Sequence, residues 1–162
     1  MAVDDQYVSV FKVHEFLTER PLSMDDLTDR IIVQKSIYLA HEAGINCGDY
    51  MWTWYKKGPY SPALTRVVYD NLKSDFDPSK YALRDDVKQA LERLKSVIKK
   101  RKSYTQLEES DWLELLASIH YLLKKHYDKN IAIRELQVLK PKYQIGHINQ
   151  AIGALEDIGF VA

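Results

Sequence analysis

The chain has 162 residues, and its 23 basic and 23 acidic residues give it a formal net charge of zero. This length corresponds to about one domain, and a composition of 46% hydrophobic and 28% charged residues excludes an intrinsically disordered chain. The zero net charge excludes a strong overall positive field that would hold nucleic acid non-specifically.

The N-terminal residues show no targeting signal. They lack the basic start and the apolar core of a signal peptide. No apolar run approaches the roughly 20 residues that a membrane-spanning helix needs. We therefore expect a cytoplasmic protein.

Two helices are predicted first. Apolar residues at helical spacing predict a helix over residues 6–19, which Pro21 ends because the residue before a proline avoids helical geometry. Ser23 and Asp26 have the spacing of a capping box and predict a second helix from Met24 to Ala43, with Gly44 as its stop. Apolar residues cover most of its circumference, so we expect this helix at the centre of the core.

An aromatic strand and a well-marked helix start follow. Residues 49–55 contain aromatics and Thr, which favours a short strand, and Gly58 and Pro59 predict a turn. At this turn Gly58 is expected to have either a positive φ or a close backbone approach. Ser61 as cap and Pro62 at the first helical position predict a helix from Pro62 to about Lys73. The residues expected on its buried stripe are Leu64, Val67, Val68 and Leu72.

The second half of the chain reads as four more helices. A loop over residues 75–80 precedes a helix over 84–100, and Ser110 is the predicted cap of the next one. After a turn at residues 128–130 come a short helix over 131–139 and a last helix from Ile145, stopped by Gly159. The chain is therefore predicted to be mainly α: a single compact domain over residues 1–162, with six or seven helices and a small β strand or hairpin near residues 50–57.

Residues 31–64 carry a resemblance to a known family. A helix with Gln34, Lys35, Tyr38 and Leu39 is followed by an aromatic strand and Gly-Pro-Tyr-Ser, here at 58–61. This pairing resembles the Panacea-domain family, also called SocA-like, including its YwgA-like branch. A weaker likeness to the family lies near the C-terminus, where Lys140-Pro141-Lys142-Tyr143 precedes the last helix.

The resemblance implies a function in protein binding. Members of the family are non-enzymatic interaction modules, often antitoxins of toxin–antitoxin systems or adaptors that present a client to a protease. It implies a groove between helix 24–43 and residues 52–64 that binds a partner protein. The partner-binding residues expected there are Lys35, Tyr38, Trp52, Trp54, Tyr55, Gly58, Pro59, Tyr60 and Ser61.

The residues themselves leave two interpretations open at this site. A buried ammonium must find a carboxylate, carbonyl groups or a groove, so Lys35 is either a structural residue or a charged anchor for a partner. In a strand, Trp52 and Trp54 share one face while Thr53 and Tyr55 share the other. One face must pack on the core, and the other either packs at an edge or forms an exposed aromatic patch beside Tyr60.

A DNA-binding regulator is the alternative function. The two helices over 131–139 and from Ile145 have the outline of a helix-turn-helix without its wing, which is also common as a plain packing unit. The basic residues that would contact nucleic acid are Lys124, Lys125, Arg134, Lys140 and Lys142.

The sequence offers little support for catalysis. The five His are scattered, without the spacing of a zinc site on one helix, and we expect no metal and no cofactor. The single Cys47 has no activating partner nearby in the sequence and excludes an internal disulfide.

Overall fold

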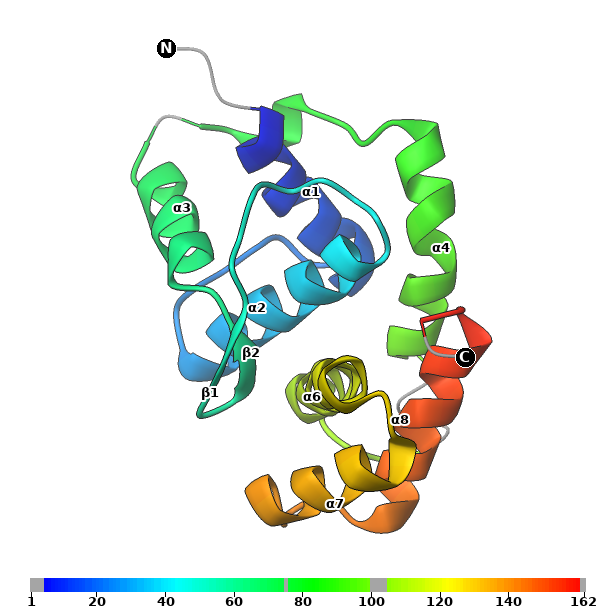
Figure 1. Cartoon of the computed structure of the whole chain (residues 1–162). Helices are drawn as coiled ribbons and strands as arrows, with labels where there is room; N and C mark the ends of the chain where they lie inside the picture. The colour runs from blue at the N-terminus through cyan, green and yellow to red at the C-terminus, as the bar shows by residue number, and fades with distance from the viewer. Residues whose placement is uncertain (1–4, 75, 100–104, 161–162) are drawn as a thin grey trace.

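A computed structural model describes residues 5–74, 76–99 and 105–160 (Figure 1). This part of the chain forms seven α-helices and one antiparallel hairpin, which confirms the predicted mainly α fold. The elements in chain order are α1 (Asp5–Thr18), α2 (Leu27–Glu42), β1 (Thr53–Tyr55), β2 (Gly58–Tyr60), α3 (Pro62–Leu72), a 3₁₀ turn (Pro78–Lys80), α4 (Asp85–Lys99), α6 (Glu109–His126), α7 (Lys129–Leu139) and α8 (Ile145–Asp157).

Helices α2 and α6 form the centre of the core. Every residue of α2 from Ile32 to Ala40 is buried, and so is every residue of α6 from Trp112 to His120. The Trp112 indole N–H donates a hydrogen bond of 3.1 Å to the Val97 carbonyl of α4, which satisfies the one polar atom of this side chain. The prediction that residues 24–43 contain the central helix is thus confirmed.

The other helices surround this pair. Figure 1 shows α1 and α3 on one side of α2, with α7 and α8 on the opposite side of the molecule beside α6. Helix α4 runs along the flank and buries Leu91, Leu94, Val97 and Ile98. None of the helices in the described ranges has the length and apolar character needed to cross a membrane.

Three helices begin elsewhere than predicted. Helix α2 begins at Leu27, because its cap is Asp26, whose carboxylate accepts from the Asp29 amide at 2.8 Å, and not Ser23. Helix α6 begins at Glu109, so Ser110 lies inside it and caps nothing. Asp128 does not form a turn but caps α7, because its carboxylate accepts from the amides of residues 130 and 131.

The predicted strand lies in a hairpin that is shifted toward the C-terminus. Thr53 pairs with Tyr60 and Tyr55 with Gly58, so Trp52 precedes the strand. Ser61 caps α3 as expected, with its hydroxyl accepting from the Leu64 amide, and Gly58 has the expected positive φ of 93°. Leu72 was expected in the core but is 44% exposed. Of the predicted helix over 84–100, Lys100 lies outside the described residues.

Candidate functional site

The end of the hairpin is attached to α2 by the side chain of Gln34. Its carboxamide N–H donates to the Ser61 carbonyl at 2.9 Å, and its carbonyl accepts from the Ser61 amide at 3.0 Å. The same nitrogen also donates to the Thr65 hydroxyl at 2.8 Å. The buried backbone groups of Ser61 are satisfied in this way, so Gln34 takes the place that a neighbouring strand would have.

Lys35 lies next to this contact and is almost completely buried. Only 1% of the residue is exposed, and its ammonium donates to the Pro59 carbonyl at 2.6 Å. Burial lowers the pKa of Lys35 to about 7, opposed by the negative charge of Glu114 and assisted by the positive charge of Lys140. Lys35 therefore fixes the hairpin to α2 and also carries a charge that responds to its surroundings near neutral pH.

Gly58 brings the hairpin into close contact with α6. A Cβ atom at this position would lie 2.3 Å from the Ser118 hydroxyl oxygen, far inside van der Waals contact. Its positive φ is itself unfavourable for other residues. The hairpin therefore packs between α2 and α6 only because residue 58 has no side chain.

A buried ion pair lies near Lys35. The ammonium of Lys140 is 3.1 Å from the carboxylate of Glu114, and both side chains are almost fully buried. Lys140 also donates to the Lys56 carbonyl at the hairpin turn and lies 5.9 Å from the centre of the Trp54 ring. Lys35 and Lys140 thus both lie near the one carboxylate of Glu114, whose negative charge opposes the lowering of their pKa by burial.

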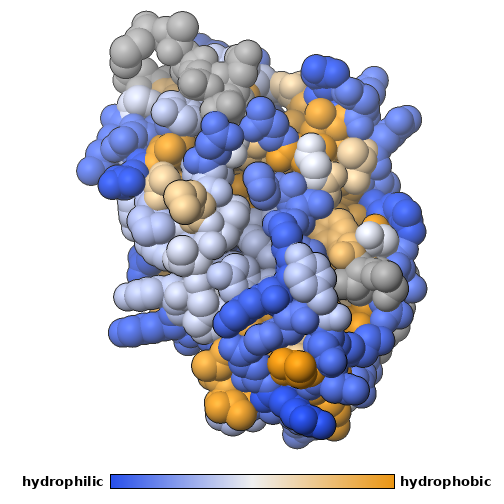
Figure 2. Space-filling view, in the orientation of Figure 1, coloured by the Kyte–Doolittle hydropathy of each residue, from blue (hydrophilic) through white to orange (hydrophobic). Residues whose placement is uncertain are grey.

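A pocket of about 290 Å³ opens between α2 and the hairpin. Three of the predicted partner-binding residues line it: Lys35, Tyr55 and Tyr60. The other lining residues, which were not among the predicted partner-binding residues, are Leu27, Arg30, Ile31, Gln34, Lys56, Lys57 and Thr65. In Figure 2, pale residues of intermediate hydropathy cover the region where Figure 1 places the hairpin and α3, and strongly hydrophilic residues project at its edge.

The remaining predicted residues lie away from the pocket. Gly58, Pro59 and Ser61 supply the backbone that α2 and α6 hold. Trp52 and Trp54 are half-buried and pack on the core, whereas Thr53 and Tyr55 on the other face are exposed.

Tyr38 is also separate from the pocket. It is buried, and its hydroxyl is 2.8 Å from Nδ1 of His120. Of the predicted partner-binding residues, some therefore line the pocket and the others pack behind it or away from it.

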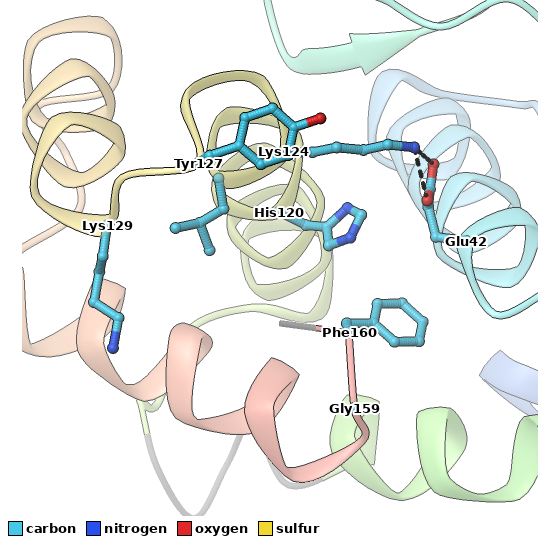
Figure 3. Close-up of a pocket in the computed structure, with 8 residues that line it drawn as sticks. Glu42, His120, Lys124, Tyr127, Lys129, Gly159 and Phe160 are labelled. Atoms are coloured by element: carbon cyan, nitrogen blue, oxygen red, sulfur yellow. Dashed lines mark hydrogen bonds and ion pairs between the residues drawn. The ribbon is translucent and has the colours of Figure 1, made fainter. Parts of the chain in front are cut away.

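A second pocket, of about 480 Å³, lies beside His120 (Figure 3). The His120 ring points toward Phe160 with ring centres 5.4 Å apart, and Lys124 reaches across to Glu42 at 3.2 Å. Burial lowers the pKa of His120, against the opposing charge of Glu42. Apart from Lys124, none of its lining residues was a predicted site residue, because the lining comes from three helices and the C-terminal segment.

The residues of the nucleic-acid alternative are spread over the molecule, and most carry an acidic partner. Lys124 pairs with Glu42 and Lys125 with Glu135, at 3.2 and 3.5 Å. Lys142 pairs with Asp111 at 3.1 Å, and Lys140 is buried against Glu114. Arg134 is exposed on α7. Cations that already pair with carboxylates neutralise fewer DNA phosphates, so fewer condensed counterions are released and the affinity for DNA is lower.

Reactive groups are few in the described part of the chain. Cys47 is buried, and burial raises the pKa of its thiol to about 12, which keeps it protonated at neutral pH. No group of three His, Cys, Asp or Glu side chains in residues 5–74, 76–99 and 105–160 is arranged to hold a metal ion.

Comparison with known proteins adds no assignment. No family model, no curated protein and no solved structure matches this chain. The resemblance to the Panacea-domain family stays a prediction, and the contacts of the chain itself are the basis for a function.

Proposed function

We propose that this protein is a non-enzymatic interaction module that binds a partner protein through the pocket between α2 and the β1–β2 hairpin. The observation that carries the proposal is the pocket itself, which joins an exposed aromatic side chain to a firmly held backbone. Tyr55 is 54% exposed, and its ring lies 5.3 Å from that of Tyr60. Tyrosines that combine exposure with a fixed position are typical of residues that dominate protein interfaces.

The pocket wall is held in place before any partner arrives. Gln34 and Lys35 tie the chain at residues 59–61 to α2 through buried hydrogen bonds, and Thr65 donates its hydroxyl to the Tyr60 phenol oxygen at 3.3 Å. A surface that is already ordered loses little conformational entropy on binding, so more of the contact energy appears as affinity. This supports a binding role for residues that otherwise only fold the hairpin.

The biological role that we propose follows from the resemblance to the Panacea-domain family. In that role the protein is an antitoxin-like protein that neutralises a toxin, or an adaptor-like protein that presents a client to a protease. Either role needs a surface that captures one protein partner and needs no catalytic group.

The test is capture of the partner from the native host with matched tyrosine variants. The tagged protein should co-purify with one stoichiometric partner, and Tyr55→Ala should lose it. Tyr81→Ala is the control, because Tyr81 is also exposed, at 41%, and lies outside this pocket. Equal capture by both variants, or no stoichiometric partner for the unmodified chain, would refute binding through this pocket.

A winged-helix-like DNA-binding regulator remains the alternative prediction. It would use α7, α8 and the basic residues 124, 125, 134, 140 and 142. The carboxylate partners of four of these residues give it less support than the pocket gives to protein binding.

A further inference from the structure

The pocket between α2 and the hairpin is surrounded by positive charge. Four of its ten lining residues are basic, namely Arg30, Lys35, Lys56 and Lys57, and none is acidic. The whole chain has a formal net charge of zero, so this is a local concentration of charge and not a property of the surface in general. Field lines are focused in such a recess and attract a ligand of the opposite sign.

Arg30, Lys56 and Lys57 have no carboxylate partner in the described part of the chain, whereas Lys35 lies near the buried carboxylate of Glu114. Arg30 donates to the Met24 carbonyl at 3.2 Å and Lys35 to the Pro59 carbonyl, and both acceptors are uncharged. Within the described residues, no ion pair joins any of the four lining cations to a carboxylate. Elsewhere the lysines at the end of α6 and after α7 do have acidic partners. The pocket therefore offers charge that a ligand can use.

The other half of the lining is apolar. Leu27 is 53% exposed, and Ile31, Tyr55 and Tyr60 complete a hydrophobic surface. A volume of about 290 Å³ suits one or two side chains and is at the small end for ligand pockets. Leaving this apolar surface in water has a free-energy cost that an inserted apolar side chain would remove.

We propose that the occupant of this pocket is an acidic segment of the partner protein. It inserts one aliphatic or aromatic side chain between Ile31 and the two tyrosines, while neighbouring Asp or Glu carboxylates pair with Arg30, Lys56 and Lys57. This inference rests on the proposed function and names the chemistry of the partner. Arg30 and the two exposed lysines form charge-assisted hydrogen bonds with carboxylates.

Lys35 adds a readout for this occupant. A carboxylate placed in the pocket favours the charged form of Lys35, whose pKa burial lowers to about 7. The charged groups that face Lys35 are Glu114 on α6 and Lys140 after α7. Binding of the acidic segment at pH 7.5 should therefore take up a fraction of a proton, measurable by titration calorimetry in buffers of different ionisation enthalpy.

The experiment selects ligands without assuming a partner. A random peptide library displayed on phage is selected on the full chain and counter-selected on Tyr55→Ala, so that only pocket-dependent peptides remain. The expected survivors carry one or two apolar residues flanked by Asp or Glu. Synthetic copies with Asn and Gln in place of the acids should bind at least tenfold more weakly by fluorescence polarisation.

Charge-reversal variants test the same point from the protein side. Lys57→Glu, at an exposed turn, and Arg30→Glu should each weaken the acidic peptides at least tenfold, whereas Lys88→Glu on the exposed face of α4 should not. A circular dichroism melt checks that each variant folds, and Lys57→Glu keeps the test valid if Arg30→Glu does not.

The outcomes separate the two proposals. Pocket-dependent peptides that are neutral or basic would overturn the acidic occupant and leave partner binding at the pocket intact. Selection that yields no peptide dependent on Tyr55 would overturn the acidic occupant and also count against the pocket as a binding site. Acidic peptides that lose affinity with Lys57→Glu but not with Lys88→Glu would support both.

Discussion

At position 58 the hairpin turn has no room for a side chain. A Cβ there would be 2.3 Å from Oγ of Ser118, and the φ of 93° is unfavourable for any residue except glycine. We expect Gly58→Ala to lower the free energy of unfolding by about 2 kcal/mol or more. Urea denaturation monitored by tryptophan fluorescence measures this change in the free energy of unfolding.

A double-mutant cycle separates the backbone strain from the collision. The Ser118 hydroxyl is buried and has no hydrogen-bond partner among the described residues, so Ser118→Ala should be close to neutral for stability. In the Ser118→Ala background the collision is relieved, and Gly58→Ala should cost about 1 kcal/mol less than in the unmodified chain. Additive effects of the two substitutions would show that strain alone accounts for the cost.

His14 makes the stability of the protein sensitive to acid. Burial, with a smaller contribution from the positive charge of Arg20, lowers the pKa of His14 to about 4. The negative charge of Asp29 opposes this shift. Between pH 6.5 and 4 the unfolded chain binds a proton at His14 that the folded chain does not. Stability present above pH 6.5 is therefore lost as the pH falls toward 4, by about 2 to 3 kcal/mol.

The variant His14→Gln isolates this contribution. Glutamine keeps a polar group near the Ser36 hydroxyl, which lies 3.1 Å from Nδ1 of His14, but takes up no proton. Urea denaturation at pH 7.5 and pH 4.5 should show a smaller loss for the variant than for the unmodified chain. Some loss should remain, because burial also lowers the pKa of His120. An unchanged loss would mean that His14 titrates normally in the folded state.

The two faces of strand β1 differ in burial, so substitutions on each face should differ in their effect on stability. Trp54 packs on Tyr121 with ring centres 5.8 Å apart, so Trp54→Ala should cost about 2 kcal/mol or more. Tyr55 faces outward, so Tyr55→Ala should change stability by no more than about 0.5 kcal/mol. Thermal melts of both variants, with partner capture, give the comparison. Similar losses of stability for both would contradict the assignment of faces.

Local signals in the sequence predicted most of the elements. Gly58 with Pro59 and Ser61 with Pro62 marked the turn and the start of α3, because glycine, proline and a capping hydroxyl each act on their own backbone. The same signals misplaced the start of α2, because the capping-box spacing made Ser23 the predicted cap and Asp26 only its partner inside the helix. In the fold Asp26 is itself the cap, which local spacing does not show.

The candidate site was harder to predict because its contacts join distant residues. Lys35 was expected to be either structural or part of a groove, and it both holds Pro59 and lines the pocket. Glu114 was not recognised as the acidic residue near it, since a carboxylate in the middle of α6 gives no sign of what it faces. Arg30, Lys56 and Lys57 are ordinary surface residues in sequence and become a group only around the pocket.

The lysines of the molecule differ in burial, although the net charge of the chain is zero. Lys140 is buried with Glu114, and Lys140→Ala should cost about 3 kcal/mol or more because it leaves Glu114 buried without its closest partner. Lys142 is exposed, and Lys142→Ala should cost less than about 1 kcal/mol. Denaturant melts of the two variants measure the difference.

The same pair of lysines bears on the nucleic-acid alternative. A fluorescently labelled DNA duplex in low salt should show no saturable binding to the unmodified chain. If binding does occur and Lys142→Ala lowers its salt slope by about one, the regulator becomes the better hypothesis. Lys140→Ala does not serve in this test, since loss of folding would imitate loss of a phosphate contact.

The contact between Gln34 and Ser61 limits which substitutions these positions tolerate during evolution. Ser61 meets the carboxamide through its backbone only, so Gln34 constrains the path of the chain at position 61 but not the identity of the residue there. Thr65, in contrast, is held through its own hydroxyl. In descendants of this chain, position 61 is therefore free to change among residues that cap a helix. Positions 34 and 65 should be substituted together, although 31 residues separate them.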